Sequence, residues 1–293
     1  MHSYLRAVGF SHVTSRAELE KIVGIVMDKP SEKYISKISR IEAITEIKKE
    51  FAEGIGVAIR GIYDEKGFFH LEHYFPYFTA KQVTTKEDIV INKRVDTDAY
   101  TGMCDDVRLG VSLIFYLQNS IEYIESNGKE GSSRIMPLIL TGLSIEGKVL
   151  LGIETNEKKM KNHQAETKQR SNLIAEARAG NQDAIDSLTI DDIDLYAMIS
   201  RRAKTEDIYS IVETSFVPYG SESDNYSIVG SILSWKLVKN VMTGEEIFEI
   251  LLNCNGLCFP ICINKQDLLG EPMVGRRFKG NIWMQGKVDF NEL

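Results

Sequence analysis

The sequence has only four cysteines and no hydrophobic run that could span a membrane. Apolar runs such as 111–117 are far shorter than the roughly 18 residues that a transmembrane helix needs. The N-terminus has no charged segment followed by an apolar one, so it does not resemble a secretory signal. Four cysteines without a dense framework are typical of reduced thiols in a cytoplasm. We therefore expect a soluble, cytoplasmic protein that does not associate with a membrane.

Positive charge is also scarce. The chain has 35 lysines and arginines against 42 aspartates and glutamates, which gives a net charge of −7. None of the segments 1–153, 154–206 and 207–293 is net basic. Nucleic-acid-binding proteins usually concentrate positive charge where they contact the phosphates. The charge pattern therefore argues against nucleic acid as a partner.

Motifs of common enzyme classes are missing. The sequence contains no complete phosphate-binding loop ending in Gly-Lys-Ser/Thr, no Gly-x-Gly-x-x-Gly fingerprint and no Gly-x-Ser-x-Gly nucleophile motif. Its five histidines provide few candidate bases for a catalytic triad. No cofactor follows from the sequence, and it leaves open whether the protein is an enzyme.

The pattern of apolar residues and turns predicts an α+β protein in three parts. Residues 1–154 are predicted to form an α+β domain with a mostly antiparallel sheet and helices. Residues 155–206 are predicted to form a helical linker or subdomain. Within them, 158–170 contains five basic residues and one acid, which is typical of either a solvated helix or a mobile connection. Residues 207–293 are predicted to form a small OB-like β-barrel domain.

In the first part, the sequence predicts a strand over Tyr4–Phe10 and a helix that begins at Ser15, where Glu18 completes a capping box. A second helix is predicted over Ile41–Phe51, where apolar residues recur every three or four positions, with Gly54 as its C-cap. The other predicted elements are strands at 55–63, 68–78, 89–95 and 107–117, a short helix at 121–124, and a hairpin at 135–153 that turns at Glu146-Gly147.

The last part contains five strand-like segments within about 85 residues, and glycines interrupt the longer ones, as in a sheet that must bend. A tight turn is predicted at Asn255-Gly256. The predicted strands are 208–217, 226–238, 247–252, 257–263 and 278–290.

Four segments carry a family resemblance: Leu5–Phe10, Cys104–Gln118, Tyr196–Arg202 and Gly275–Gly280. Together they resemble a bacterial family that is classed only as a domain of unknown function, and the resemblance runs nearly from end to end. It implies a bacterial cytoplasmic protein with one family-wide architecture. It implies no activity and no site residue.

Four aspartates form the candidate metal site. Asp96, Asp98, Asp105 and Asp106 lie within eleven residues, in a predicted loop between strands. Their carboxylates are suited to a hard cation or to general acid and base catalysis. The spacing does not match an EF-hand. The alternative is an acidic turn in which the aspartates bind backbone N–H groups.

Two other groups of metal-binding residue types are predicted to be structural. His70 and His73 are predicted to point to opposite faces of a strand, so they share no metal unless a bulge intervenes. Cys254, Cys258 and Cys262 have a spacing that zinc tolerates. They lie beside a core strand, however, and are predicted to be buried thiols that pack as small hydrophobes.

Arg276, Arg277, Lys279 and Trp283 form the candidate ligand-binding patch. On an OB-like barrel, such a cationic and aromatic patch suits stacking against a base or binding an anion. The alternative is a turn with solvated or ion-paired arginines.

These observations support three hypotheses. The best supported is a non-catalytic binding or interaction protein with an unknown protein or small-molecule partner, because strand and turn signals are abundant and no catalytic motif is assembled. The second is a metal-assisted enzyme that uses the acidic loop 96–106. The third is a single-stranded nucleic-acid binder that uses the C-terminal barrel.

Overall fold

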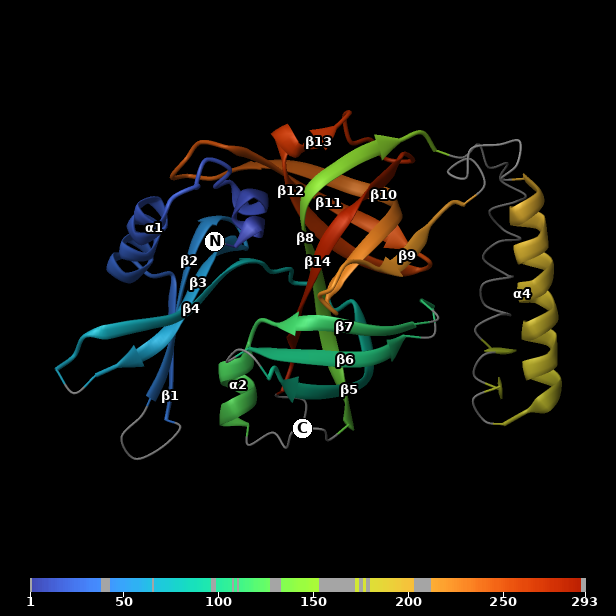
Figure 1. The fold of residues 1–293 in the computed structure, drawn as a ribbon, viewed down its shortest axis with the longest axis horizontal. Helices are drawn as coiled ribbons and strands as arrows, with labels where there is room; N and C mark the ends of the chain where they lie inside the picture. The colour runs from blue at the N-terminus through green and yellow to red at the C-terminus, as the bar shows by residue number, and fades with distance from the viewer. Residues whose placement is uncertain are drawn as a thin grey trace.

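The computed structural model describes residues 2–37, 43–64, 66–95, 99–106, 108–109, 111–126, 133–152, 172–173, 176–177, 180–202 and 212–290. This part of the chain is mostly β, with few helices (Figure 1). The helices are η1 (Ser3–Val8), α1 (Arg16–Asp28), α2 (Ser120–Glu125), α4 (Gln182–Arg202) and η2 (Lys265–Asp267). The strands are β1 (Glu32–Lys37), β2 (Ala43–Ala52), β3 (Ile55–Tyr63), β4 (Phe69–Phe78), β5 (Thr85–Lys93), β6 (Tyr100–Asp106), β7 (Val111–Leu117), β8 (Ser133–Leu150), β9 (Ser215–Pro218), β10 (Asn225–Lys239), β11 (Glu246–Cys254), β12 (Leu257–Asn264), β13 (Leu268–Leu269) and β14 (Arg277–Val288).

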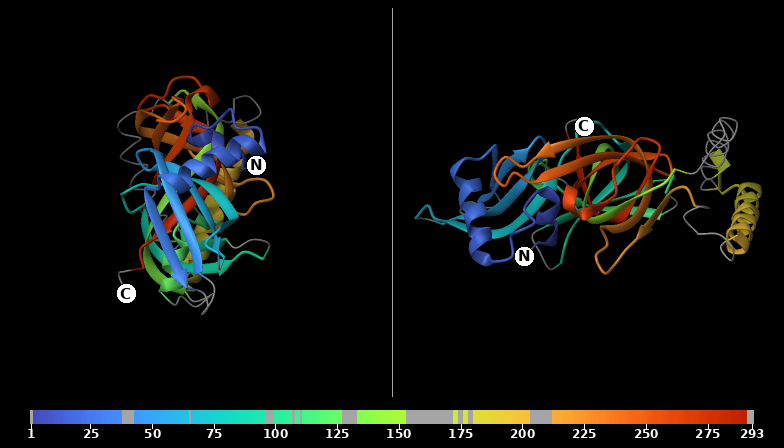
Figure 2. Two further views of the ribbon diagram at one scale, coloured as in Figure 1. Left: turned by 90° about the vertical axis from the view of Figure 1, so that its left-hand side faces the viewer. Right: turned by 90° about the horizontal axis from the view of Figure 1, so that it is seen from above.

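The first sheet is antiparallel, with the order β1-β2-β3-β4. Helix α1 lies on the outer face of this sheet, away from the second sheet (Figures 1 and 2). The helix begins at Ser15, whose side chain and Glu18 form the expected capping box. Its apolar face buries Ile22 and Val26 in the same core as Phe51 of β2. The predicted antiparallel sheet with helices is therefore confirmed.

Two predictions at the N-terminus are wrong. Tyr4–Phe10 is not a strand, because residues 3–8 form the 3-10 helix η1, which ends at Gly9 with a φ of 85°. Ile41–Phe51 is not a helix: its described residues from Ala43 onward belong to strand β2. Apolar residues at helical spacing were misleading there because β2 pairs with strands on both sides and is buried on both faces at residues 44–47.

The second sheet closes into two rings that share the long strands β8 and β14. In one ring the pairing runs β8-β12-β11-β10-β14 and returns to β8. In the other it runs β8-β5-β6-β7-β14 and returns to β8. In Figure 1, β8 and β14 pass through both rings. A single apolar core lies inside both rings. It includes Ile89 in the second ring and both Phe248 and Phe259 in the first.

Four glycines make room for two phenylalanine rings in this sheet. A Cβ atom at Gly102 or Gly286 would lie within 3.0 Å of the Phe115 ring. A Cβ atom at Gly147 or Gly280 would lie equally close to the ring of Phe278. Real Cβ contacts are essentially never this short. Each ring therefore packs against strand backbone, a close approach that only glycine permits.

The region predicted as a hairpin at 135–153 is instead one continuous strand, β8, so the predicted turn at Glu146-Gly147 is wrong. Gly147 pairs with Leu268 on one side and with Gly280 on the other. A glycine that resembled a turn signal is thus the contact point for the Phe278 ring. Strand β6 was also missed, because its acidic end was assigned to a loop.

Strand pairing crosses the predicted boundaries at residues 154 and 207. Strand β8, from the first predicted part, pairs with β12, β13 and β14 from the last. The ring that includes β10–β12 and β14 thus needs β8 to close. The C-terminal region is ring-like, as expected, but its OB-like character is not confirmed, and the three-part domain division stays a prediction.

Most other strand and turn predictions for the described residues are confirmed. Strand β3 has the predicted bounds, and β4, β10, β11, β12 and β14 differ from theirs by a few residues at most. Asn255 and Gly256 both have positive φ, as a tight hairpin turn requires. Helix α4 confirms helical structure at 182–202, whereas 158–170 lies outside the described residues. No helix in the described ranges is long and apolar enough to cross a membrane.

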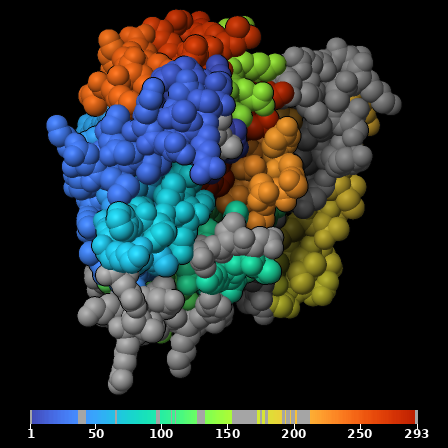
Figure 3. Space-filling model, turned by 60° about the vertical axis from the view of Figure 1, so that its left-hand side comes forward, coloured from blue at the N-terminus to red at the C-terminus, as the bar shows by residue number. Residues whose placement is uncertain are grey.

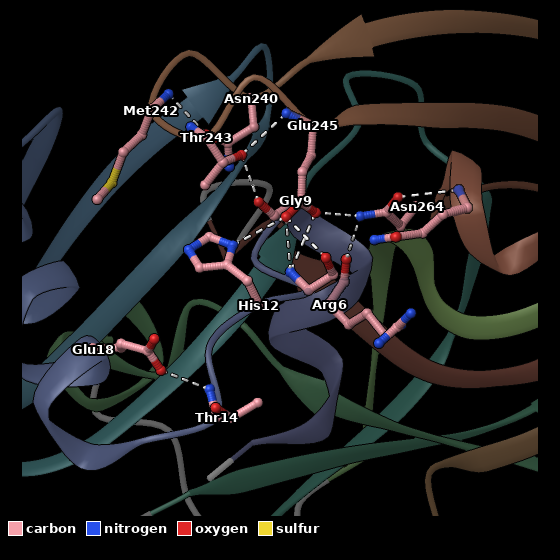
Figure 4. Close-up of polar contacts among 12 residues, drawn as sticks. Arg6, Gly9, His12, Thr14, Glu18, Asn240, Met242, Thr243, Glu245 and Asn264 are labelled. Atoms are coloured by element: carbon pink, nitrogen blue, oxygen red, sulfur yellow. Dashed lines mark hydrogen bonds and ion pairs between the residues drawn. The ribbon is translucent and has the colours of Figure 1, made fainter.

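Glu245 joins the N-terminal segment to the turn between β10 and β11 (Figure 4). Its carboxylate accepts hydrogen bonds from the Ser11 hydroxyl at 2.9 Å and from Asn264 Nδ2 at 2.5 Å, and it lies 3.1 Å from His12 Nδ1. Burial opposes ionisation of Glu245, but the hydrogen bonds from His12 and Ser11 outweigh it and hold the pKa below its ordinary value. Glu245 therefore binds these donors as a carboxylate.

This arrangement predicts a pH dependence of stability. Because the folded-state pKa of Glu245 is lowered, its contribution is present above the unfolded pKa of about 4.3 and is lost as the pH falls through the folded value. We expect Glu245→Gln to unfold with a shallower loss of stability below about pH 4.5 than the wild type, measured by urea denaturation at a series of pH values. Glu20→Gln, on the surface of α1, controls for the loss of one exposed carboxylate. Equal pH slopes for Glu245→Gln and the wild type would contradict this role.

Candidate functional site

A row of polar side chains crosses the first sheet on the face turned toward the second. Tyr34 of β1 pairs directly with Glu46 of β2, Glu46 with Arg60 of β3, and Arg60 with His73 of β4. Directly paired residues of neighbouring strands point to the same face of a sheet. The row therefore faces Tyr116 of β7, which contacts both Arg60 and His73.

A β-bulge in β4 sets the position of His73. Arg60 pairs with His73, but the next residue, Gly61, pairs with Leu71, so Glu72 is the extra residue. The bulge places His70 and His73 on the same face, whereas the sequence predicted opposite faces. They have different partners: His70 Nε2 lies 2.9 Å from Asp64, and His73 Nε2 lies 3.3 Å from the Tyr116 hydroxyl.

Glu46 is the buried carboxylate of the row. It is 1% exposed and accepts from Arg60 Nε and, at 3.0 Å, from Lys48 Nζ. Burial alone would raise the pKa of Glu46, but attraction to Arg60 and Lys48 outweighs burial and lowers it. Glu46 is therefore ionised and shared between two cations.

Arg60 has one nitrogen whose donor capacity is unused in the described structure. The side chain is buried, and its Nη2 donates to the Gln118 carbonyl at 3.3 Å. The guanidinium lies 4.8 Å from the centre of the Phe75 ring and 6.0 Å from that of Tyr116. Nη1 is buried and has no hydrogen-bond partner among the described residues. Buried donors are nearly always paired, so this nitrogen calls for an explanation.

Aromatic rings continue from Tyr116 toward the surface. Tyr116 lies 5.0 Å from Trp283, centre to centre, and Trp283 also contacts the rings of His2 at 4.6 Å and Tyr4 at 5.5 Å. Burial raises the pKa of Tyr116 to about 12. Burial, together with His73, lowers the pKa of His2 to about 4, so both side chains are neutral at pH 7.

We name this group the inter-sheet cluster; its members are Glu46, Arg60, His73, Tyr116, Trp283, His2 and Tyr4. Glu46, Arg60, Tyr116 and Trp283 are buried, and the other members are half-buried. Figure 3 views the molecule from the side of the N-terminal segment, which is blue, with the β3–β4 region in cyan. The cluster thus runs from partly exposed rings to a buried guanidinium.

The ion pair between Arg94 and Asp224 holds Trp283 in place. Its Nε1 donates to Asp224 at 3.0 Å, and Arg94 Nη2 contacts the same carboxylate at 2.6 Å. Asp224 is buried, and burial raises its pKa despite the opposing effects of Arg94 and Trp283. Arg94 is therefore engaged with Asp224 beside the cluster.

The other members of the predicted ligand-binding patch lie elsewhere. Arg277 is buried and donates to the carbonyls of Leu151 at 3.0 Å and Val212 at 2.8 Å. It precedes Trp283 by six residues on β14, about 20 Å at roughly 3.3 Å per residue. Arg276 donates to the Glu271 carbonyl at 3.5 Å, and Lys279 is half-buried on β14. Trp283 is thus not brought together with Arg277, and ligand binding by the patch stays a prediction.

The candidate metal residues are only partly described. Asp105 and Asp106 are neighbours on strand β6 and therefore point to opposite faces. Asp105 accepts from the Ser112 hydroxyl at 2.6 Å, and the buried Asp106 pairs with Arg108. Asp96 and Asp98 lie outside the described residues. No group of three or more potential metal ligands occurs in the part of the chain that the structure describes, and the metal site stays a prediction.

The predicted roles of the cysteines are confirmed in part. Cys254 and Cys262 are buried free thiols, and burial raises the pKa of both. Cys258 is also a free thiol, but it is exposed.

Comparison with known proteins identifies the family. The family model described as "Domain of unknown function, E. rectale Gene description (DUF3881)" matches residues 5–286 of the 293. The chain belongs to the DUF3881 family. The family region includes both sheets and α4, in agreement with the end-to-end resemblance. No curated protein and no solved structure matches the chain.

Sequence reasoning missed most of the inter-sheet cluster. Of its members, only Trp283 was a candidate site residue, and His73 was interpreted as structural. Glu46 fell within a predicted helix, which hid its pairing with Arg60. An acidic residue inside an otherwise apolar segment was the available signal, because a buried carboxylate requires a cationic partner.

Proposed function

We propose that the protein is a bacterial, cytoplasmic, non-catalytic binding protein and that a small planar ligand binds at the inter-sheet cluster. The observation that carries this proposal is the buried Nη1 of Arg60, which no described residue pairs. It lies in a cluster that reaches the surface through the half-buried rings of His2, Tyr4 and His73. Aromatic rings supply stacking surfaces for a planar molecule.

The state of the charged groups favours binding over catalysis. The Glu46 carboxylate is shared by Arg60 and Lys48, and Asp224 is engaged by Arg94 and Trp283. A general base needs a lone pair that can reach the substrate proton. Because cations contact both carboxylates, the cluster is better suited to binding a ligand than to transferring a proton.

Tryptophan fluorescence tests the proposal. The chain has two tryptophans, Trp283 in the cluster and Trp235, which is 43% exposed on β10. In Trp235→Phe, Trp283 is the only remaining reporter. We expect benzoate, benzamide or benzamidine at millimolar concentration to change its emission in a saturable way, because a ring bound in the cluster would change the surroundings of the Trp283 indole.

The matched control is Trp283→Phe, in which the surface residue Trp235 reports. It should show no saturable change with the same compounds. Absence of a saturable change for all three compounds in Trp235→Phe would reject the cluster as a site for small planar ligands.

A further inference from the structure

The buried end of the inter-sheet cluster contains a guanidinium donor that no described residue pairs. Arg60 and Lys48 both contact Glu46, and Lys48 also lies opposite Glu32 in the pairing of β1 with β2. Arginine is cationic at neutral pH, and a buried polar group is costly unless it is hydrogen-bonded. Nη1 of Arg60 is therefore a buried cationic donor with unused capacity.

We propose that the ligand of the inter-sheet cluster carries a carboxylate and that Nη1 of Arg60 donates to it. This inference rests on the proposed function and names the chemical class of its ligand. A guanidinium nitrogen donating to a carboxylate oxygen forms a charge-assisted hydrogen bond, which is stronger than a neutral one. The carboxylate would satisfy the unused donor at Nη1.

The environment favours a monocarboxylate over a phosphate. A monocarboxylate brings one negative charge to a single donor, whereas a phosphate dianion would bring two charges into a buried setting, where unpaired charge is costly. Within the described structure Arg60 has a single nitrogen to offer, since Nε contacts Glu46 and Nη2 contacts the Gln118 carbonyl. The rings of Phe75 and Tyr116 flank the guanidinium and suit the ring of an aromatic acid.

The bulge in β4 provides a partly exposed neighbour of Arg60. His73 pairs directly with Arg60 and is half-buried, whereas Arg60 and Glu46 are 1% exposed. The partly exposed end of the row at His73 is therefore the immediate neighbour of the buried guanidinium.

Benzoate and benzamide separate the inference from the proposed function, because they have nearly the same shape and differ in charge. Binding is measured by Trp283 fluorescence in Trp235→Phe. We expect benzoate to bind at least about tenfold more tightly than benzamide, a difference of about 1.4 kcal/mol. When Arg60→Lys is added, the charge is kept but Nη1 is lost, so we expect this preference to weaken. Arg108→Lys changes another arginine that is paired with a carboxylate, and it should retain the preference.

Equal affinities for benzoate and benzamide would overturn the inference and leave the proposed function standing, as would a benzoate preference that is undiminished in Arg60→Lys. Failure of both compounds, and of benzamidine, to bind would overturn both. If Arg60→Lys does not fold, arginine side-chain NMR of Trp235→Phe decides. Benzoate, but not benzamide, should then shift the signal of a buried guanidinium, and no shift would overturn the inference.

Discussion

Glu46→Ala is expected to lower the free energy of unfolding by about 3–5 kcal/mol, because it leaves the buried Arg60 charged and without its carboxylate. Arg60 is 1% exposed, so water cannot replace the lost partner. Lys48, whose side chain is 14% exposed, is closer to solvent and contributes less to the loss. Urea denaturation followed by circular dichroism measures the change.

Replacing both partners should behave differently. The double variant Glu46→Met/Arg60→Met removes both charges and keeps apolar volume between the sheets, so most of the lost stability should return. Glu20→Ala breaks the exposed pair with Arg16 and should change stability by no more than about 1 kcal/mol. If Glu46→Ala were no more destabilising than Glu20→Ala, the pair would not have the buried environment described for it.

Gly102→Ala is expected to destabilise the protein by about 1–3 kcal/mol or more, through overpacking. The new Cβ atom would lie within 3.0 Å of the fully buried Phe115 ring, which also packs on Gly286 and has little room to move. The same substitution at Gly24, in the middle of α1, meets no described atom within 4 Å. Gly24→Ala should therefore stabilise the protein by about 0.5–1 kcal/mol, because alanine favours the helix.

The two alanine variants are a matched pair with effects of opposite sign, and thermal or urea unfolding compares them directly. Phe115→Leu combined with Gly102→Ala tests the cause, because the smaller side chain should make the added methyl group less costly. A neutral Gly102→Ala variant would contradict the close packing of Phe115 on the β6 backbone.

The candidate site was accessible to sequence reasoning only in pieces. Trp283 was identified as part of a candidate patch, but it was grouped with Arg277, which contacts other backbone carbonyls. Glu46 and Arg60 become neighbours only because β2 and β3 pair in one register. His73 joins them because of a bulge at Glu72, which a regular alternating pattern does not reveal.

Local features of this protein follow from its sequence without knowledge of the fold. The capping box of Ser15 and Glu18, the turn at Asn255-Gly256 and the strand over 55–63 each depend on residues that are adjacent or a few positions apart. Tertiary pairing was needed to make residues 43–52 a strand and to close the rings, where β8 meets strands more than 100 residues away. The physical reason is that strand pairing satisfies the backbone hydrogen bonds of one segment with those of a distant one. Whether a segment forms a strand therefore depends on partners that no local pattern specifies.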